Sequence, residues 1–228
     1  MNNRTIIQRV LSLYAAGIQS DDIRLSHRHA FNTLSSNRSK LITDKIKKNQ
    51  IVSISTYQEL PCISMEKAQP FECPNIDNTN AYILKSTYPL PDLLTDMNSH
   101  LITFTSLDGS SVFKLNGFKT RNYSKGAKYT GKLPTLYLMP SMHLYASFSS
   151  HQDAVAAIGL FKDPIKPCIF PKFCKPFDSC KSYLDYDFPI DGDSETTLIE
   201  MTANELIANF KRSRADVQNN SRDDSSQG

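Results

Sequence analysis

Four carboxylates crowd into nine positions around a glycine in the C-terminal part of the sequence: Asp187, Asp191, Asp193 and Glu195. Acidic side chains at such spacing are candidate ligands for Ca²⁺, but an EF-hand loop also needs a glycine at its sixth position and a glutamate at its twelfth. Counted from Asp191, these two positions hold Thr196 and Thr202. The pattern of a calcium loop therefore fails at two defining positions.

The same stretch has the pattern of a helix start, in which an Asp or Ser precedes an apolar-periodic run. Either Asp193 or Ser194 is predicted to cap the helix, and Glu195 places a negative charge in its first turn, where the helix dipole favours it. We expect this helix over about 194–210, with these residues on its apolar face: Leu198, Ile199, Leu206, Ile207 and Phe210. Capping is favoured over metal binding because it requires only features that are present.

The cysteines are the second candidate for chemistry. Three of the five follow a C-x5-C-x5-C pattern: Cys168, Cys174 and Cys180. A zinc site needs four ligands and usually contains a pair spaced C-x2-C to C-x4-C, so Cys62 or Cys73 would have to join them. The odd count and the lack of a secretory signal predict free thiols. No cofactor is expected, and zinc on the three clustered cysteines stays an alternative.

Motifs of common enzymes are missing from the sequence. It contains no G-x-S-x-G, no glycine-rich phosphate loop and no H-E-x-x-H, so we expect a protein that is not an enzyme. No apolar run reaches the roughly 20 residues that a membrane span needs, and no membrane contact is expected.

Charge is distributed unevenly, although the formal net charge is only +3. Residues 1–50 hold nine Lys and Arg against three Asp, and residues 178–205 hold eight Asp and Glu against one Lys. Opposed poles of this kind suggest that the two regions contact each other, either within one chain or between neighbouring copies.

Two helices are predicted before residue 50, over 3–16 and from about Ser20 to Lys48. Their apolar positions recur at helical spacing and include Ile6, Val10, Leu11, Phe31, Leu34 and Leu41. Basic residues of the second helix lie largely off its apolar stripe, among them Arg24, Arg28, Arg38 and Lys40.

Patterns typical of β-strands occur after residue 50. Residues 102–115 carry Asp108-Gly109 between two β-rich arms, residues 135–148 form a second hairpin pattern, and residues 154–161 a buried strand. The predicted fold class is α+β: a helical bundle from the N-terminal helices and a C-terminal helix, with an inserted antiparallel β-domain. The predicted divisions are 1–50 plus 190–212 for the helical body, 51–189 for the β-rich insertion and 213–228 for a flexible tail.

Four segments together resemble a known family. They read IIQRVLSLYAAGIQSDDIRLSHRHAFNTLSSNRSKLI, STYQELPCISMEKAQPFECP, GLFKDPIKPCIFP and FPIDGDSETTLIEMTANELI. In this order and spacing they are similar to a ring or adaptor protein of the head-to-tail connector of tailed bacteriophages, in the crAss-like group. The resemblance extends over roughly residues 5–210 and rests on the whole pattern.

This resemblance implies a virion protein, made in the host cytoplasm, that forms a ring of twelve copies. It would dock on the portal protein, join other connector and tail ring proteins, and line or support the channel for the packaged DNA. The residues we assign to the oligomer and portal interface are Arg24, Arg28, Arg38, Lys40, Asp191, Asp193 and Glu195. The alternative is a cytoplasmic zinc-binding or nucleic-acid-binding module, the latter based on the basic helix.

Overall fold

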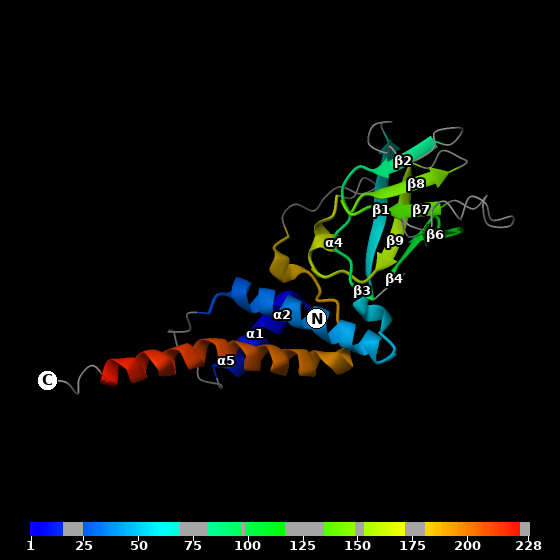
Figure 1. Cartoon of the computed structure of the whole chain (residues 1–228). Coiled ribbons are helices and arrows are strands. Elements are labelled where there is room, and N and C mark those ends of the chain that lie inside the picture. The colour runs from blue at the N-terminus through cyan, green and yellow to red at the C-terminus, as the bar shows by residue number, and fades with distance from the viewer. Residues whose placement is uncertain are drawn as a thin grey trace. The chain divides into compact units, whose positions relative to one another are not determined.

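The computed structural model divides the chain into two compact units, one formed by Met1–Thr56 with Lys181–Gly228 and the other by Tyr57–Cys180. We call them the helical unit and the barrel unit, and the fold class is α+β (Figure 1). The described residues are 1–15, 25–68, 82–96, 99–116, 135–148, 153–171 and 181–223. At 210–223 this description covers the backbone alone.

Both N-terminal helices begin at a side-chain cap. Helix α1 spans Asn3–Tyr14, and the Asn2 side chain accepts a hydrogen bond from the backbone N–H of Thr5. Helix α2 spans His27–Lys47 and is capped by Ser26. The predicted start near Ser20 is therefore wrong, because the helix begins at His27 and the Ser26 hydroxyl accepts a hydrogen bond from the backbone N–H of His29. Residues 16–24, with Arg24, lie outside the described part.

Helix α2 ends in a Schellman motif. Asn49 has a φ of +55°, and the N–H groups of Asn49 and Gln50 donate to the carbonyls of Ile46 and Lys45. Asparagine tolerates this left-handed conformation better than most residues. The chain leaves the helix in a fixed direction, toward the short 3₁₀ helix η1 at Ile54–Thr56.

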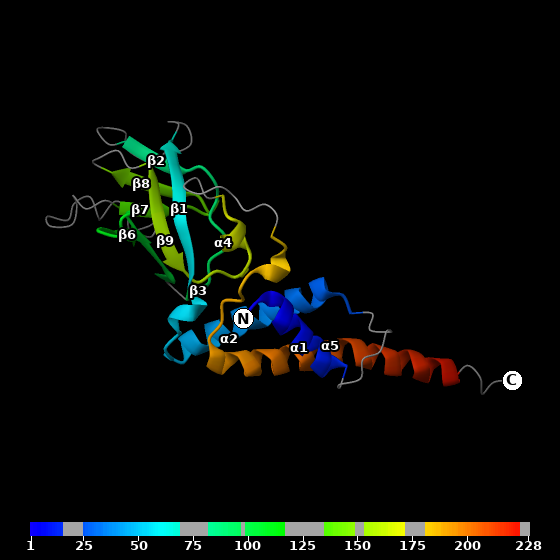
Figure 2. The same ribbon diagram turned by 180° about the vertical axis from the view of Figure 1, so that it is seen from behind.

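The closing helix α5 spans Gly192–Asp223, so it is longer than the predicted 194–210. The segment predicted to be a flexible tail from residue 213 is helical through Asp223, because the residues after 210 include no glycine or proline before the helix ends and several good helix formers. Within the helical unit, α5 runs beside α1 and α2, and its C-terminal part extends past both of them (Figures 1 and 2).

The helical unit buries an apolar core where α1 and α2 contact α5. Of the apolar residues expected there, Leu11, Leu41 and Ile207 are half-buried, and the side chain of Phe210 is not described. The others are buried: Ile6, Val10, Phe31, Leu34, Leu198, Ile199 and Leu206. Phe31 also packs edge-on against Tyr183, with ring centroids 5.4 Å apart.

The barrel unit is a closed sheet in the order β1-β2-β8-β7-β6-β5-β9. Strands β3 (Thr95–Asp96) and β4 (Ser99–His100) form a separate ribbon. Helix α4 spans Lys166–Ile169. The barrel strands are β1 (Gln58–Lys67), β2 (Tyr82–Ser86), β5 (Ile102–Thr105), β6 (Val112–Asn116), β7 (Thr135–Leu138), β8 (Leu144–Phe148) and β9 (Ala154–Gly159).

Both predicted hairpins and the predicted strand are confirmed. Strands β5 and β6 pair antiparallel around Gly109, whose φ is +71°, and β7 pairs antiparallel with β8. Strands β6 and β7, however, are parallel, which corrects the expectation of a purely antiparallel domain. Seven strands cannot alternate in direction all the way around a closed barrel, so one neighbouring pair must be parallel.

Large apolar side chains fill the barrel. Phe104, Leu136 and Leu144 are fully buried in its core cluster. Proline is usually excluded from strand interiors because it lacks the N–H of the ladder. Pro61 is accommodated in β1 because the pairing with β9 shifts register between Leu60 and Ile63. The barrel interior is therefore a packed core, as expected for a small barrel.

Candidate assembly surface

The start of α5 is anchored by Asp191. Its carboxylate accepts a hydrogen bond of 2.6 Å from the backbone N–H of Ser194 and forms an ion pair of 2.9 Å with Lys45 of α2. Lys45 also donates to the Ser194 hydroxyl. The predicted cap, Asp193 or Ser194, is thus wrong by a few residues. The acidic stretch begins a helix, and Asp191 both caps α5 and joins it to α2.

These contacts shift the ionisation of Asp191. Partial burial pushes the pKa of the carboxyl up, but hydrogen bonds from Lys45 and Ser194 and the charge of Lys45 outweigh it, so the pKa lies below its ordinary value. Asp191 is consequently ionised at neutral pH, and its charge is matched by a lysine of the same chain.

Further ion pairs connect the basic N-terminal region to the acidic C-terminal region. Arg9 of α1 lies 2.7 Å from Glu195 of α5, and Lys40 of α2 lies 3.6 Å from Glu205. The two opposed charge poles therefore meet within one chain. Of the two alternatives that the sequence left open, the structure shows the intrachain contact.

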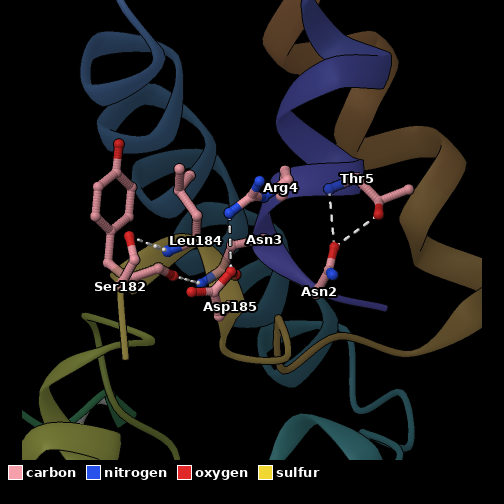
Figure 3. Close-up of polar contacts among 8 residues, drawn as sticks. Asn2, Asn3, Arg4, Thr5, Ser182, Leu184 and Asp185 are labelled. Carbon is pink, nitrogen blue, oxygen red and sulfur yellow. Dashed lines mark hydrogen bonds and ion pairs between the residues drawn. The ribbon is translucent and has the colours of Figure 1, made fainter. Parts of the chain in front are cut away.

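The N-terminus of α1 also contacts the segment that precedes α5, as Figure 3 shows. Arg4 reaches Asp185 at 3.0 Å, and the buried Asn3 donates from its side-chain amide to the carbonyl of Tyr183 at 2.6 Å. Segments far apart in the sequence are thereby fixed to each other at one end of the helical unit.

Arg38 has the least expected position of the predicted interface residues. Its side chain is fully buried, with Nε donating to the carbonyl of Pro189 at 2.7 Å and Nη2 to the carbonyl of Thr56 at 3.2 Å. The prediction of an outward-facing Arg38 is wrong, because these carbonyls bind the guanidinium inside the subunit. The same contacts explain why residues 51–56 and 181–189, predicted to be part of the β-domain, belong to the helical unit.

The remaining predicted interface residues differ in exposure. Arg28 and Asp193 are exposed, Lys40 is exposed but paired, and Asp191 and Glu195 are half-buried and paired. The paired charges offer less to a partner than unpaired ones, since binding would have to replace contacts that already exist.

Two isoleucines that the sequence patterns did not single out are almost fully exposed. Ile51 is 94% and Ile54 87% accessible. The sequence pattern predicts that this stretch begins an extended region, in which alternate residues face a core. A helix stop at Asn49, followed by a non-strand connection, was the signal that would have placed them on the surface.

The cysteine predictions need one correction. Cys62 is disulfide-bonded, so the expectation of free thiols is wrong there, and Cys62 is removed from any zinc set. Cys168 keeps its thiol, whose Sγ lies 3.6 Å from the carbonyl oxygen of Pro164. Cys174 and Cys180 lie outside the described residues. Among the side chains that the structure describes, no three potential ligands gather closely enough to hold a metal ion.

The class of protein to which this chain belongs is shown by comparison with known proteins. A family model described as phage tail ring protein 2 matches residues 5–225. The chain therefore belongs to this family of ring proteins from crAss-like phages, as the resemblance in the sequence predicted. A comparison with curated proteins finds no match.

Family membership gives the protein a structural role in a ring of the phage tail region and a place in the virion, and it favours a non-enzymatic role. No helix in the described part of the chain is both long and apolar enough to cross a membrane.

Proposed function

We propose that this protein is a ring-forming adaptor of the head-to-tail connector, which docks on the portal and joins it to the tail. The match to the tail ring family over nearly the whole chain carries this proposal. The ring would contain twelve copies, held together around helical bodies in which α1, α2 and α5 act as a bundle.

The helical unit is suited to such a role because ion pairs and a buried guanidinium join its elements within one copy. Asp191, Glu195 and Arg38 hold elements of the same subunit together. A copy can thus keep its shape before it meets its neighbours, and less ordering is required when the ring forms.

The packaged DNA would pass through this ring without sequence-specific contacts. Arg28 is exposed, and arginine is one of the residues that contact phosphate oxygens. Basic residues that line a channel would support DNA electrostatically, and the strength of this contact would fall as salt concentration rises.

The proposal is tested by electron microscopy of the purified full-length protein, alone and mixed with the portal of the same phage. We expect rings that stack coaxially on the portal, with twelve-fold symmetry. The matched control is the portal with an unrelated protein of similar charge, which should leave it uncovered. Failure to form a ring under either condition, together with its absence from virions, would contradict the proposed function.

A further inference from the structure

The segment after α2 presents apolar side chains to solvent on a fixed backbone. Ile51 and Ile54 are the two most exposed large apolar residues of the described chain. The left-handed Asn49 fixes where the segment starts. At its other end Thr56 is buried and its carbonyl accepts a hydrogen bond from Arg38. An exposed apolar pair held by contacts at both ends is preorganised for binding.

A groove of about 490 Å³ lies elsewhere on the helical unit, between α1 and α5. Most of its accessible surface is apolar although most of its lining residues are polar, and the two apolar ones are Leu13, which is 48% exposed, and Ile199. Glu200 stands at the groove and has no ion-pair partner among the described residues, whereas the nearby Arg9 is paired with Glu195. The groove thus combines a mostly apolar surface with one unmatched negative charge.

We propose that Ile51 and Ile54 of one copy bind the α1–α5 groove of a second copy, and that this is the contact between ring neighbours. This inference rests on the proposed ring function and specifies its surfaces. Both isoleucines are exposed and so do not occupy the groove of their own chain, and the groove that binds them in this proposal is that of a neighbouring copy.

Charge favours a second copy as the occupant. Lys47 and Lys48 lie just before the apolar pair, both are exposed, and neither has an ion-pair partner among the described residues. Docking Ile51 and Ile54 in the groove would bring these two lysines toward Glu200 of the second copy. The contact joins two different surfaces of the same protein, which leaves one of each free on every dimer and lets the assembly continue into a closed ring.

The first test removes the apolar pair in the full-length protein. We expect Ile51→Ser with Ile54→Ser to raise the concentration needed for half-assembly, measured by mass photometry, by at least about ten-fold. Circular dichroism should show unchanged folding, since neither side chain is buried. Val112→Ser, at a barrel residue that is 70% exposed, is the matched control and should assemble normally. Unchanged assembly of the double variant would overturn the inference.

The second test detects the contact between the two surfaces directly and does not depend on ring closure. Equimolar Ile54→Cys and Leu13→Cys proteins are mixed, oxidised and analysed by non-reducing electrophoresis. We expect a cross-linked dimer in the mixture and much less of it with the native protein or with either variant alone. A dimer without rings would support this contact but contradict the ring function. Rings without a specific dimer would overturn the contact and leave the ring function standing.

A charge exchange tests whether Lys48 of one copy lies next to Glu200 of its neighbour. Lys48→Glu and Glu200→Lys should each weaken assembly by about five-fold, and the protein that carries both changes should recover most of the loss. Equal losses that simply add in the double variant would mean that the two residues do not meet, and would contradict the proposed register.

Discussion

The two units of this protein are stabilised in different ways. The barrel unit encloses an apolar interior in a sheet without free edges, with Phe104 and Leu144 fully buried. The helical unit has an apolar core of its own and adds polar anchors, among them the buried Arg38 and the Asp191–Lys45 pair. A barrel can satisfy its backbone by closure alone, whereas separate helices need specific contacts to fix how they meet.

This difference bears on assembly. Because carboxylates at the start of α5 are matched by lysine and arginine of the same chain, few of them remain for partners. The apolar pair at Ile51 and Ile54 and the unmatched charges near it are then the stronger candidates for contacts between copies. Most of the charged residues that the sequence assigned to an interface form contacts inside the subunit.

The largest expected effect comes from removing barrel core. Phe104 is fully buried and pairs with Phe113 across the β5–β6 hairpin. Phe104→Ala should lower the free energy of unfolding of the barrel by about 3–5 kcal/mol, through lost burial and the cavity it leaves. Hydrogen exchange of the barrel amides measures this loss separately from the helical unit. Val112→Ala is the control and should change stability by less than about 0.5 kcal/mol.

The corresponding destabilising substitution in the helical unit is at Arg38. Arg38→Met fills similar space but leaves the carbonyls of Thr56 and Pro189 without this donor. We expect a loss of about 3 kcal/mol, seen as faster exchange of the α2 and α5 amides. The exposed Arg28 on the same helix is the matched control, and Arg28→Met should have almost no effect. Equal effects of the two substitutions would show that the buried guanidinium is not an anchor.

The Asp191 anchor should make the helical unit sensitive to acid. Because the folded state lowers the pKa of this carboxyl, its contribution is complete above the unfolded pKa of about 4 and is lost as pH falls through the folded value. Asp191→Asn keeps a capping side chain but removes the charge, and should cost about 1 kcal/mol at pH 7. Thermal melts from pH 7 to pH 3 should converge for the two proteins, and a constant difference would contradict this assignment.

The smallest effect is expected at the exposed Lys40–Glu205 pair, whose side chains are 58% and 37% accessible. Lys40→Ala should cost no more than about 0.5 kcal/mol, and 1 M salt should remove the difference. Melts at low and high salt test this. A larger cost, insensitive to salt, would mean that Lys40 acts through packing or through its hydrogen bond to Asn37.

Local patterns predicted much of the secondary structure. The Asp108-Gly109 turn, the second hairpin and the strand at 154–159 are each set by residues close in sequence, and the structure contains them. The predicted start of α2 is too early in the sequence, and the predicted end of α5 is too early as well. Helix ends depend on which side chain reaches a free N–H or carbonyl, and several nearby residues compete for that role.

The candidate site was predicted less well. Arg38 falls off the apolar stripe of its helix, so periodicity assigned it to the surface. Only the fold brings the carbonyls of Thr56 and Pro189, which lie far apart in the sequence, to the same guanidinium. Ile51 and Ile54 were missed for the opposite reason, since apolar residues ahead of a strand are normally expected to be buried.

The sequence by itself determined the family, the presence of helices at both ends, the β-rich middle and the opposed charges of residues 1–50 and 178–205. Only the tertiary structure decided that those charges pair within one chain, that Arg38 is internal and that an apolar pair is left exposed. The physical reason is range: propensity, capping and turn chemistry act over a few residues, whereas burial and ion pairing depend on which distant segments the fold brings together.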